Sequence, residues 1–294
     1  MRNAFIDELV ALARHNPQIA LIVGDLGYSV VEPFAEEFPE RFINAGVAEQ
    51  NMMGIAAGMA SEGYHVFVYS IANFPTFRCA EQIRNDVDYH KLAVTIVAVG
   101  GGLAYGALGY SHHAVQDYAL MRSMPNMLIA APGDPMEVRG CVRYLVENPC
   151  PSYLRLGKAG EPSFHDNVPE IKPGEWLSIA SGNTKKNKVL LSTGATLELA
   201  YTWLSKDPAY ALYSLPMWGM SVKEKQENQS KNWQEITTIE DHLMDGGFGT
   251  WLMESLYDSS FDLNQIHIRC LDKKVCGMVA KQTTLNSLGG LILR

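Results

Sequence analysis

Several features that would indicate an extracellular, membrane-spanning or zinc-binding protein are scarce in this sequence. Its five cysteines, at 79, 141, 150, 270 and 276, are odd in number and never show CxxC spacing, so they predict neither a disulfide framework nor a zinc site. The N-terminal segment lacks the uncharged apolar core of a signal peptide, and no window is apolar enough to cross a membrane. We therefore expect a cytoplasmic protein whose cysteines are reduced.

Positive charge is also in short supply. The 294 residues include 24 Lys and Arg against 32 Asp and Glu, which gives a formal net charge of -8. Such a chain has no basic footprint for nucleic acid or for an anionic membrane, so we expect neither as a partner. With 47% apolar residues, the length predicts an ordinary globular protein of two domains or one large one.

Short β-branched runs alternate with longer amphipathic segments in the first half of the chain. Strands are predicted at 19–23, 65–69, 93–99, 127–131 and 152–156, and helices at 48–62, 76–88, 114–124 and 134–148. This alternation predicts an α/β domain with a mainly parallel sheet over 1–160.

The composition then changes before the pattern restarts. Residues 161–187 are rich in Gly, Pro and polar residues and are predicted to form a linker. Further strands are predicted at 188–193, 209–215, 235–241 and 265–270, with helices ending near 205 and starting at 247. A second, smaller α/β domain is therefore expected over 188–294.

One carboxylate stands at the head of a helix that otherwise looks suited to burial. In "GVAEQNMMGIAAGMA", Glu49 precedes Met52, Ile55 and Met59, whose spacing forms one apolar stripe. An acid in a first helical turn complements the helix dipole, and this role alone would explain it.

The same segment resembles the pyrimidine-binding domain of thiamine-diphosphate enzymes of the transketolase family, where Gly-Val/Ile-x-Glu-Gln opens a Gly/Ala-rich helix. The resemblance continues through "CAEQIRNDVDY", "GYSHHAVQDYALMRSMPNMLIAAPGD" and "PSYLRLGK", and reaches "ITTIEDHLMDGGFGTWL" in the second half. It implies a parallel-sheet pyrimidine-binding domain followed by the smaller transketolase C-terminal domain.

The resemblance implies that Glu49 is catalytic and binds the cofactor. The cofactor's own aminopyrimidine removes the thiazolium C2 proton, and an acid bonded to pyrimidine N1′ promotes the imino tautomer that this step needs. Burial favours a neutral carboxyl, which can share a proton with N1′.

Further contacts follow from the resemblance, residue by residue. Phe74 and Phe77 fit ring positions that stack on the pyrimidine, with Phe74 as the main partner, although Ile71 stands where an aromatic residue is common. Core packing would explain Phe77 equally well. In "VGDLGYS", Asp25 is implied as a cofactor contact and Ser29 as a substrate contact, although a plain strand-to-helix turn explains both.

Two basic positions are implied to contact the substrate. His112 takes the place of the histidine beside the substrate carbonyl oxygen, so a catalytic and substrate-binding role is implied, and at most one of His112 and His113 should face the cofactor. Arg155 matches an arginine that binds the substrate phosphate; an exposed strand-end arginine paired with a surface acid is the alternative.

Two positions depart from the family pattern. Leu108 falls where transketolases carry an aspartate that contacts the donor hydroxyl, and Gly100 falls where they often have a histidine. The donor pocket should therefore be less polar, so either the substrate is not an ordinary ketose phosphate or the acceptor end is rebuilt for a modified sugar.

The family's magnesium and diphosphate segment, Gly-Asp-Gly followed by Asn, is missing. The two Gly-Asp sequences, at 24–25 and 133–134, lack the second Gly. The resemblance thus implies that Mg²⁺ and the diphosphate of thiamine diphosphate are held mainly by a separate N-terminal subunit, and that this chain has no metal site of its own. A homodimer of this chain within an α₂β₂ heterotetramer is expected.

Three functions remain open from the sequence. The preferred one is a subunit of a split transketolase that transfers a two-carbon ketol unit between sugars. The β chain of a 2-oxo acid decarboxylase, or another acyl-transferring thiamine enzyme, is favoured somewhat by Leu108. A catalytically silent paralogue that only binds a partner is disfavoured by Glu49 and His112.

Overall fold

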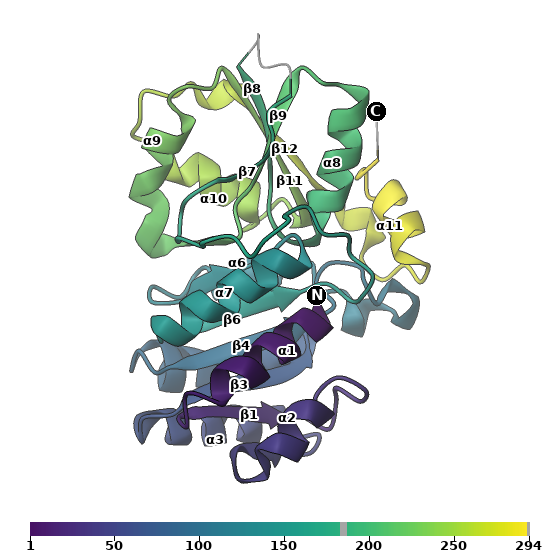
Figure 1. Ribbon diagram of the computed structural model, residues 1–294. Coiled ribbons are helices and arrows are strands. Elements are labelled where there is room, and N and C mark those ends of the chain that lie inside the picture. The colour runs from purple at the N-terminus through teal and green to yellow at the C-terminus, as the bar shows by residue number, and fades with distance from the viewer. Residues whose placement is uncertain (183–186, 293–294) are drawn as a thin grey trace.

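The strands of the first half form one sheet that is covered by helices on both faces. The computed structural model describes residues 1–182 and 187–292, which form two α/β lobes stacked on each other (Figure 1). In order of position, the first sheet runs β10-β5-β6-β4-β3-β1-β2, and every pair in it is parallel except β10 with β5. Its strands are β1 (Ile19–Val23), β2 (Phe42–Asn44), β3 (His65–Ile71), β4 (Val94–Val99), β5 (Leu128–Ala130), β6 (Ser152–Leu156) and β10 (Met217–Gly219).

Two apolar layers hold the helices against this sheet. One layer joins it to α1 (Arg2–Ala13), α2 (Glu32–Glu37) and α7 (Pro135–Glu147). The other joins it to α3 (Glu49–Ser61), a π-helical turn (Ile83–Asp88) and α6 (Asp117–Met121). The short helices α4 (Asn73–Phe77) and α5 (Ala80–Gln82) lead from β3 into the π-helical turn. Burial on both faces explains why the strands read as continuous hydrophobic runs. The α/β fold class expected from the sequence is confirmed.

The second lobe is a smaller sheet with the order β12-β11-β8-β9-β7. It contains β7 (Leu177–Ala180), β8 (Lys188–Ser192), β9 (Tyr210–Ser214), β11 (Glu235–Leu243) and β12 (Ile266–Leu271), with β7 antiparallel to β9. Its helices are α8 (Leu197–Lys206), α9 (Gln226–Ser230), α10 (Phe248–Ser255) and α11 (Gln282–Leu288). Short 3₁₀ turns occur at Pro39–Arg41, Gly106–Leu108, Tyr110–His112, Gly194–Thr196, Met220–Lys225, Leu263–Gln265 and Lys273–Val275.

The boundary between the lobes is more interwoven than the sequence pattern indicates. Strand β7 lies inside the range predicted to be a linker, of which 183–186 fall outside the described residues, as do 293–294 of the predicted second domain. Strand β10 belongs to the second half of the chain but pairs with β5 of the first sheet, where Met217 lies opposite Ala130. A three-residue strand is too short to show a periodic signal.

Two predicted helices are shorter than expected. The range 76–88 contains the end of α4, the short α5 and the π-helical turn, while only α6 is helical within 114–124. A π-helical turn requires a shifted hydrogen-bond register that apolar periodicity does not reveal.

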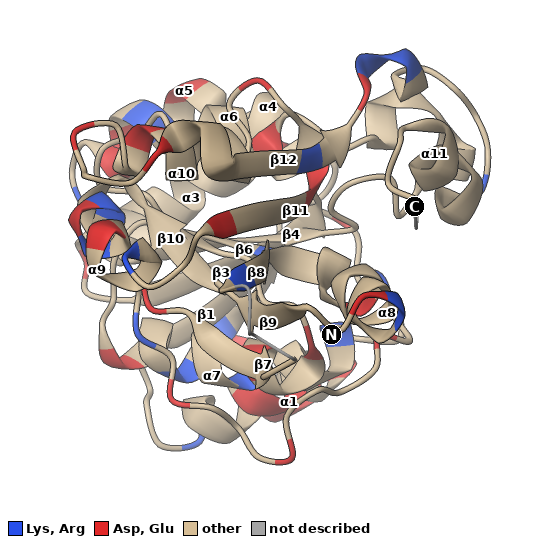
Figure 2. Ribbon diagram, turned by 90° about the horizontal axis from the view of Figure 1, so that it is seen from above, with Lys and Arg blue, Asp and Glu red and all other residues tan. Residues whose placement is uncertain are grey.

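Helix α11 lies to one side of the second sheet (Figures 1 and 2). Its Leu285 belongs to an apolar cluster with Leu103 and Val115 of the first lobe. The C-terminal part of the chain therefore supports the loop that follows β4.

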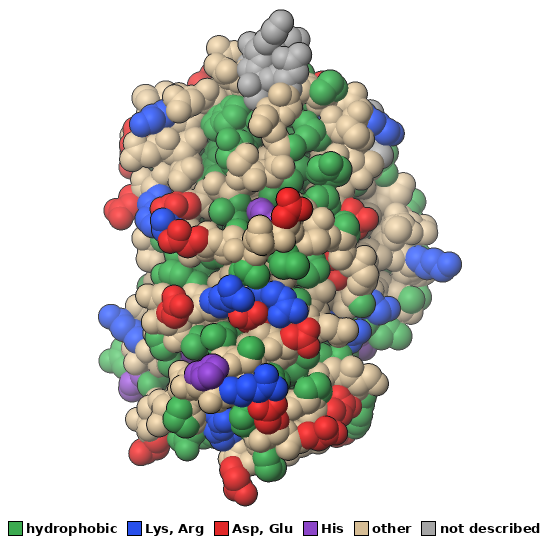
Figure 3. All heavy atoms as spheres, viewed as in Figure 1, with side chains coloured by type: hydrophobic (Ala, Val, Ile, Leu, Met, Phe, Trp, Pro, Cys, Tyr) green, Lys and Arg blue, Asp and Glu red, His purple; other side chains and the backbone are tan. Residues whose placement is uncertain are grey.

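Charged residues of both signs are interspersed along the ribbon of the two lobes (Figure 2). On the face covered by α1 and α7, basic side chains lie beside acidic ones (Figure 3), and Arg139 and Arg143 of α7 pair with Glu8 of α1. Within the described residues, no helix combines the length and apolarity needed to cross a membrane.

Candidate functional site

The predicted cofactor and substrate residues gather at one edge of the first sheet. Asp25 follows β1, Glu49 follows β2, Phe74 follows β3, and His112 lies in the loop after β4. These four strands are neighbours, in the order β4-β3-β1-β2. Because parallel strands end at the same edge of a sheet, the topology brings residues from four distant segments to one surface, which is where ligands bind in open α/β sheets.

Glu49 begins α3 and lies on the buried face of that helix. The face continues through Met52, Met53 and Ala56, so that the acid shares its side of the helix with apolar residues, and Glu49 is only 5% exposed. The buried face is rotated from the predicted stripe, because Ile55 is only partly buried. The buried acid expected at the helix head is thus present.

Arg78 connects Glu49 to Phe74. Its Nη1 donates a hydrogen bond to Glu49 Oε1 at 2.8 Å, and its Cζ lies 4.2 Å from the centroid of the Phe74 ring. Phe74 lies in α4 and Arg78 follows its last residue, four positions on, so the two side chains extend from one side of the helix. Phe77, the last residue of α4, is exposed rather than packed in the core.

His112 lies on the same surface. Its ring packs edge-on against Phe74 with 5.2 Å between centroids, and Ser111 Oγ is 3.0 Å from its Nδ1. Burial lowers the pKa of His112, and the nearby His113 and Arg78 lower it further. His113 is fully buried, and its Nε2 lies 3.4 Å from the Gly106 carbonyl oxygen. Of the two histidines, His112 is therefore the one beside Phe74.

Asp25 and Ser29 form a tight turn at the end of β1. Both have positive φ, at 56° and 63°, which is uncommon for residues other than glycine. Asp25 Oδ1 accepts hydrogen bonds from Asn44 Nδ2 at 3.1 Å and from the Tyr28 hydroxyl at 3.2 Å. Asn44 ends β2 and its Oδ1 also accepts from Gly46, so this turn is tied to the segment that leads into Glu49. The Ser29 amide donates to Glu32 within its own turn.

Tyr105 fills the space at the position where the family pattern has a histidine. A Cβ at Gly100, where φ is 80°, would lie 2.1 Å from Tyr105 Cε2. The Tyr105 ring is also edge-on to His112, with 6.4 Å between centroids, while Leu108 is exposed. Sequence reasoning missed Tyr105, and the only available signal was an aromatic residue shortly after a run of glycines.

Arg155 is separated from this surface by burial. It is 2% exposed, and it donates from Nε to Asp117 Oδ2 at 2.6 Å and from Nη1 to Asp241 Oδ1 at 2.5 Å. Its Nη2 donates to the Ala114 carbonyl oxygen at 2.8 Å. Since all three nitrogens have partners inside the protein, this geometry argues against the prediction that Arg155 binds a substrate phosphate. The alternative, an exposed arginine at a strand end, is wrong.

Two open pockets meet at Arg78. One is lined by Val47, Ala48, Glu49, Gln50 and Asn51, and the other by Asn73, Phe74, Phe77, Tyr110, Ser111 and Gln116. Several apolar side chains around them, including Val47, Phe77 and Tyr110, are exposed. Across 1–182 and 187–292, no three His, Cys, Asp or Glu side chains are grouped in a way that could hold a metal ion. The surface therefore offers an acid and an aromatic ring in open pockets, without a group of metal ligands among the described residues.

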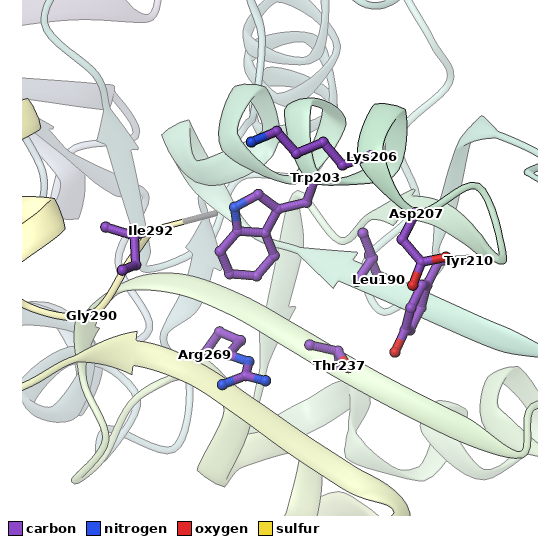
Figure 4. A pocket seen from close by; sticks show the side chains of 9 residues that line it. All are labelled: Leu190, Trp203, Lys206, Asp207, Tyr210, Thr237, Arg269, Gly290 and Ile292. Carbon is purple, nitrogen blue, oxygen red and sulfur yellow. The ribbon is translucent and has the colours of Figure 1, made fainter. Parts of the chain in front are cut away.

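Another pocket lies in the second lobe, between α8 and β12 (Figure 4). Its lining includes Trp203, Lys206, Asp207 and Arg269, which contribute charges of both signs. None of the residues predicted from the sequence lies in it. We therefore place the candidate site at the edge of the first sheet.

Comparison with known proteins identifies the family to which the first lobe is similar. Residues 1–160 match the family model described as transketolase, pyrimidine binding domain. An apulose-4-phosphate transketolase subunit from Phocaeicola vulgatus is 34% identical over 275 residues, covering 91% of this chain and 86% of that protein. The protein of the same name from Actinobacillus succinogenes is 27% identical, covering 86% and 82%. A solved split gene transketolase, described as an inactive β4 tetramer, is 30% identical with a TM-score of 0.82, covering 100% of this chain and 94% of that one.

Proposed function

Since the chain belongs to the transketolase family, with the pyrimidine-binding domain at 1–160, we propose that it is the pyrimidine-binding subunit of a two-chain, thiamine-diphosphate-dependent transketolase. Such an enzyme transfers a two-carbon ketol unit between sugars. The observation that carries the proposal is the buried Glu49 at the head of α3, which lines a pocket and is connected to Phe74 through Arg78.

The residues present fit the ring of the cofactor. Glu49 would bond pyrimidine N1′ from a nearly dry helix end, Phe74 would stack on the ring, and Asp25 would contact the cofactor from the adjacent turn. When bound, the cofactor supplies the carbon nucleophile that accepts the ketol unit. The chain's own contribution is to hold the ring and to set the proton at N1′.

His112 is suited to moving a proton at the substrate oxygen. Its pKa lies below the ordinary value of 6.5, so the ring is mostly neutral at pH 7 and can accept a proton from a hydroxyl group. Its Nδ1 is close to Ser111 Oγ, which orients the ring and leaves Nε2 for the substrate.

A second subunit would complete the site. The pockets around Glu49 are open, apolar side chains surround them, and the described residues form no metal cluster. The solved relative described as an inactive tetramer supports the idea that a chain of this kind does not act alone. We propose that the partner holds the diphosphate and Mg²⁺, within an α₂β₂ assembly built on a homodimer of this chain.

A phosphorylated sugar is the substrate class that we propose. The relatives named above are named for a sugar phosphate, and Tyr105 and Leu108 make the donor end less polar than the family pattern. Because Arg155 is fully paired, Lys158 is our candidate for the phosphate contact. It follows β6 at the same sheet edge, and its Nζ lies 5.3 Å from the Tyr105 ring centroid.

Calorimetric titration of thiamine diphosphate with Mg²⁺ tests this function. We expect binding by the mixture of this chain with a partner that carries the Gly-Asp-Gly segment, and none by this chain alone. Glu49→Gln in the assembled complex should lower ketol transfer at least about 100-fold because N1′ loses its acid.

A matched substitution, Glu224→Gln on an exposed segment of the second lobe, should leave ketol transfer unchanged. Cofactor binding by the isolated chain, or full activity of Glu49→Gln, would contradict the proposal. Activity that requires a 2-oxo acid and lipoamide instead of a sugar donor would favour the acyl-transferring alternative.

A further inference from the structure

Arg78 lies between the two residues that are proposed to hold the cofactor ring. Its guanidinium donates to the Glu49 carboxylate and covers the face of Phe74. These are the two contacts that the pyrimidine itself requires, a hydrogen bond to the acid and a stack on the aromatic ring. One side chain of the protein makes both of them.

A guanidinium group is chemically similar to the edge of an aminopyrimidine that carries a proton at N1′. Both are planar, delocalised nitrogen cations that donate N–H bonds within their plane and present a flat face to an aromatic ring. Arg78 therefore satisfies Glu49 and Phe74 in the way that the cofactor ring would.

We propose that Arg78 occupies the place of the aminopyrimidine in the cofactor-free chain, and that the ring displaces it on binding. This inference rests on the proposed function of Glu49 and Phe74. Glu49 is almost wholly buried whereas the Arg78 side chain is 49% exposed, so the arginine covers the acid from the solvent side. The guanidinium can leave by rotation of its own side chain, without movement of α3 or α4.

The displacement has an energetic consequence. The cofactor must break an ion pair and a cation–π contact before it makes equivalent contacts of its own, so Arg78 weakens its affinity. In return, Glu49 keeps a partner in the absence of the cofactor, which avoids leaving an unpaired carboxylate at a buried helix end.

The test compares cofactor affinity in the assembled complex with the partner subunit. Arg78→Met removes the charge and the N–H donors while keeping a similar length, and we expect it to bind thiamine diphosphate about fivefold to tenfold more tightly than wild type. Arg84→Met is the control, because Arg84 is exposed and its Nη1 donates to the neighbouring Asn85 in the following turn. That variant should bind the cofactor as wild type does.

Inorganic diphosphate with Mg²⁺ separates an effect on the ring from an effect of charge. It has no ring, so its affinity should not increase in Arg78→Met. Equal or weaker binding of the whole cofactor by Arg78→Met, with ketol transfer lowered in Glu49→Gln, would overturn the role of Arg78 and leave the proposed function standing. Full ketol transfer by Glu49→Gln would instead overturn the proposed function.

Discussion

Arg78 and Arg155 both pair with carboxylates near the carboxyl edge of the first sheet, but their surroundings differ. Arg155 is 2% exposed and joins Asp117 of the first lobe to Asp241 of the second, with every guanidinium nitrogen donating. The Arg78 side chain is 49% exposed, and its Nη1 donates to Glu49. The Arg155 cluster is closed and holds the two lobes together. At Arg78, by contrast, a ligand can replace the guanidinium at Glu49 and at the face of Phe74.

The difference shows why burial decides the role of an arginine more than its motif does. Arg155 lies in a segment that carries the family resemblance and is predicted to contact the substrate, yet its guanidinium is buried and its nitrogens donate inside the protein. The glycines after β4 are part of this closure, since a Cβ at Gly101 would lie 2.6 Å from Arg155 Cζ and one at Gly102 would lie 2.1 Å from Asp241 Oδ2. Arg78 had no predicted role, but its guanidinium lies at the proposed cofactor site.

The largest effect is expected from breaking the closed cluster. Arg155→Leu leaves Asp117 and Asp241 buried without their cation, so the free energy of unfolding should fall by about 3–5 kcal/mol. Urea denaturation of the chain measures this loss. Asp241→Asn, which keeps a hydrogen-bond acceptor, should cost less and provides a second measurement if Arg155→Leu does not fold.

The control for this prediction is an exposed pair of the same chemistry. Arg14 Nε donates to Glu37 Oε1 at 2.6 Å on the surface of the first lobe. Arg14→Leu should leave the free energy of unfolding nearly unchanged because water screens such pairs. Equal losses for Arg14→Leu and Arg155→Leu would show that burial does not set the difference.

Much of the first lobe could be predicted because its signals are local. The runs at 19–23 and 152–156 are strands with the predicted bounds, since a strand buried on both faces is hydrophobic throughout. The position of Glu49 at a buried helix start follows from a short motif and from apolar periodicity. Its catalytic role, the cofactor contact of Asp25 and the substrate contact of Ser29 remain predictions.

The missed features all depend on tertiary contacts that a local sequence pattern does not contain. The burial of Arg155 requires Asp241, which lies 86 positions away on another sheet, and Tyr105 fills the space beside Gly100 only because their loop folds back. The three residues of strand β10 come from the second half of the chain and pair with β5 in the first sheet. The Glu49–Arg78 contact is also non-local, and no single-segment pattern contains it.

An intermediate effect is expected at the open site, where Phe74 and Phe77 can be compared. Phe74 contacts both Arg78 and His112, whereas Phe77 is exposed. Phe74→Ala should weaken cofactor binding by the assembled complex by about 1–2 kcal/mol, or roughly tenfold, because the ring loses its stacking partner. Phe77→Ala, the matched control from the same short helix, should change it by less than about threefold.

Calorimetry measures both affinities. A larger loss for Phe77→Ala would mean that the pyrimidine lies against the outer ring and that the stack assigned to Phe74 is wrong.

The smallest effect on stability is expected at a partly exposed ion network between the lobes. Arg122, after α6, donates two hydrogen bonds to Glu254 of α10, and Lys223 donates a third. The hydrogen bond from Arg122 is the main cause that lowers the pKa of Glu254 from 4.5 to about 2. Because the folded-state pKa lies below the unfolded one, the stabilisation is complete above about pH 5 and is lost as the pH falls toward 2.

Glu254→Gln should therefore cost about 1 kcal/mol at pH 7, a small value because the Glu254 side chain is 47% exposed and screened by water. The difference from wild type should shrink below pH 4 and in 1 M salt, as thermal unfolding across pH would measure. Glu224→Gln, with no ion pair at that side chain among 1–182 and 187–292, should show neither trend. A cost for Glu254→Gln that stays constant from pH 7 to pH 2 would show that packing, rather than charge, joins the lobes there. Arg122, whose exposure lies between those of Arg155 and Arg78, would then not fit the dependence of ion-pair strength on burial.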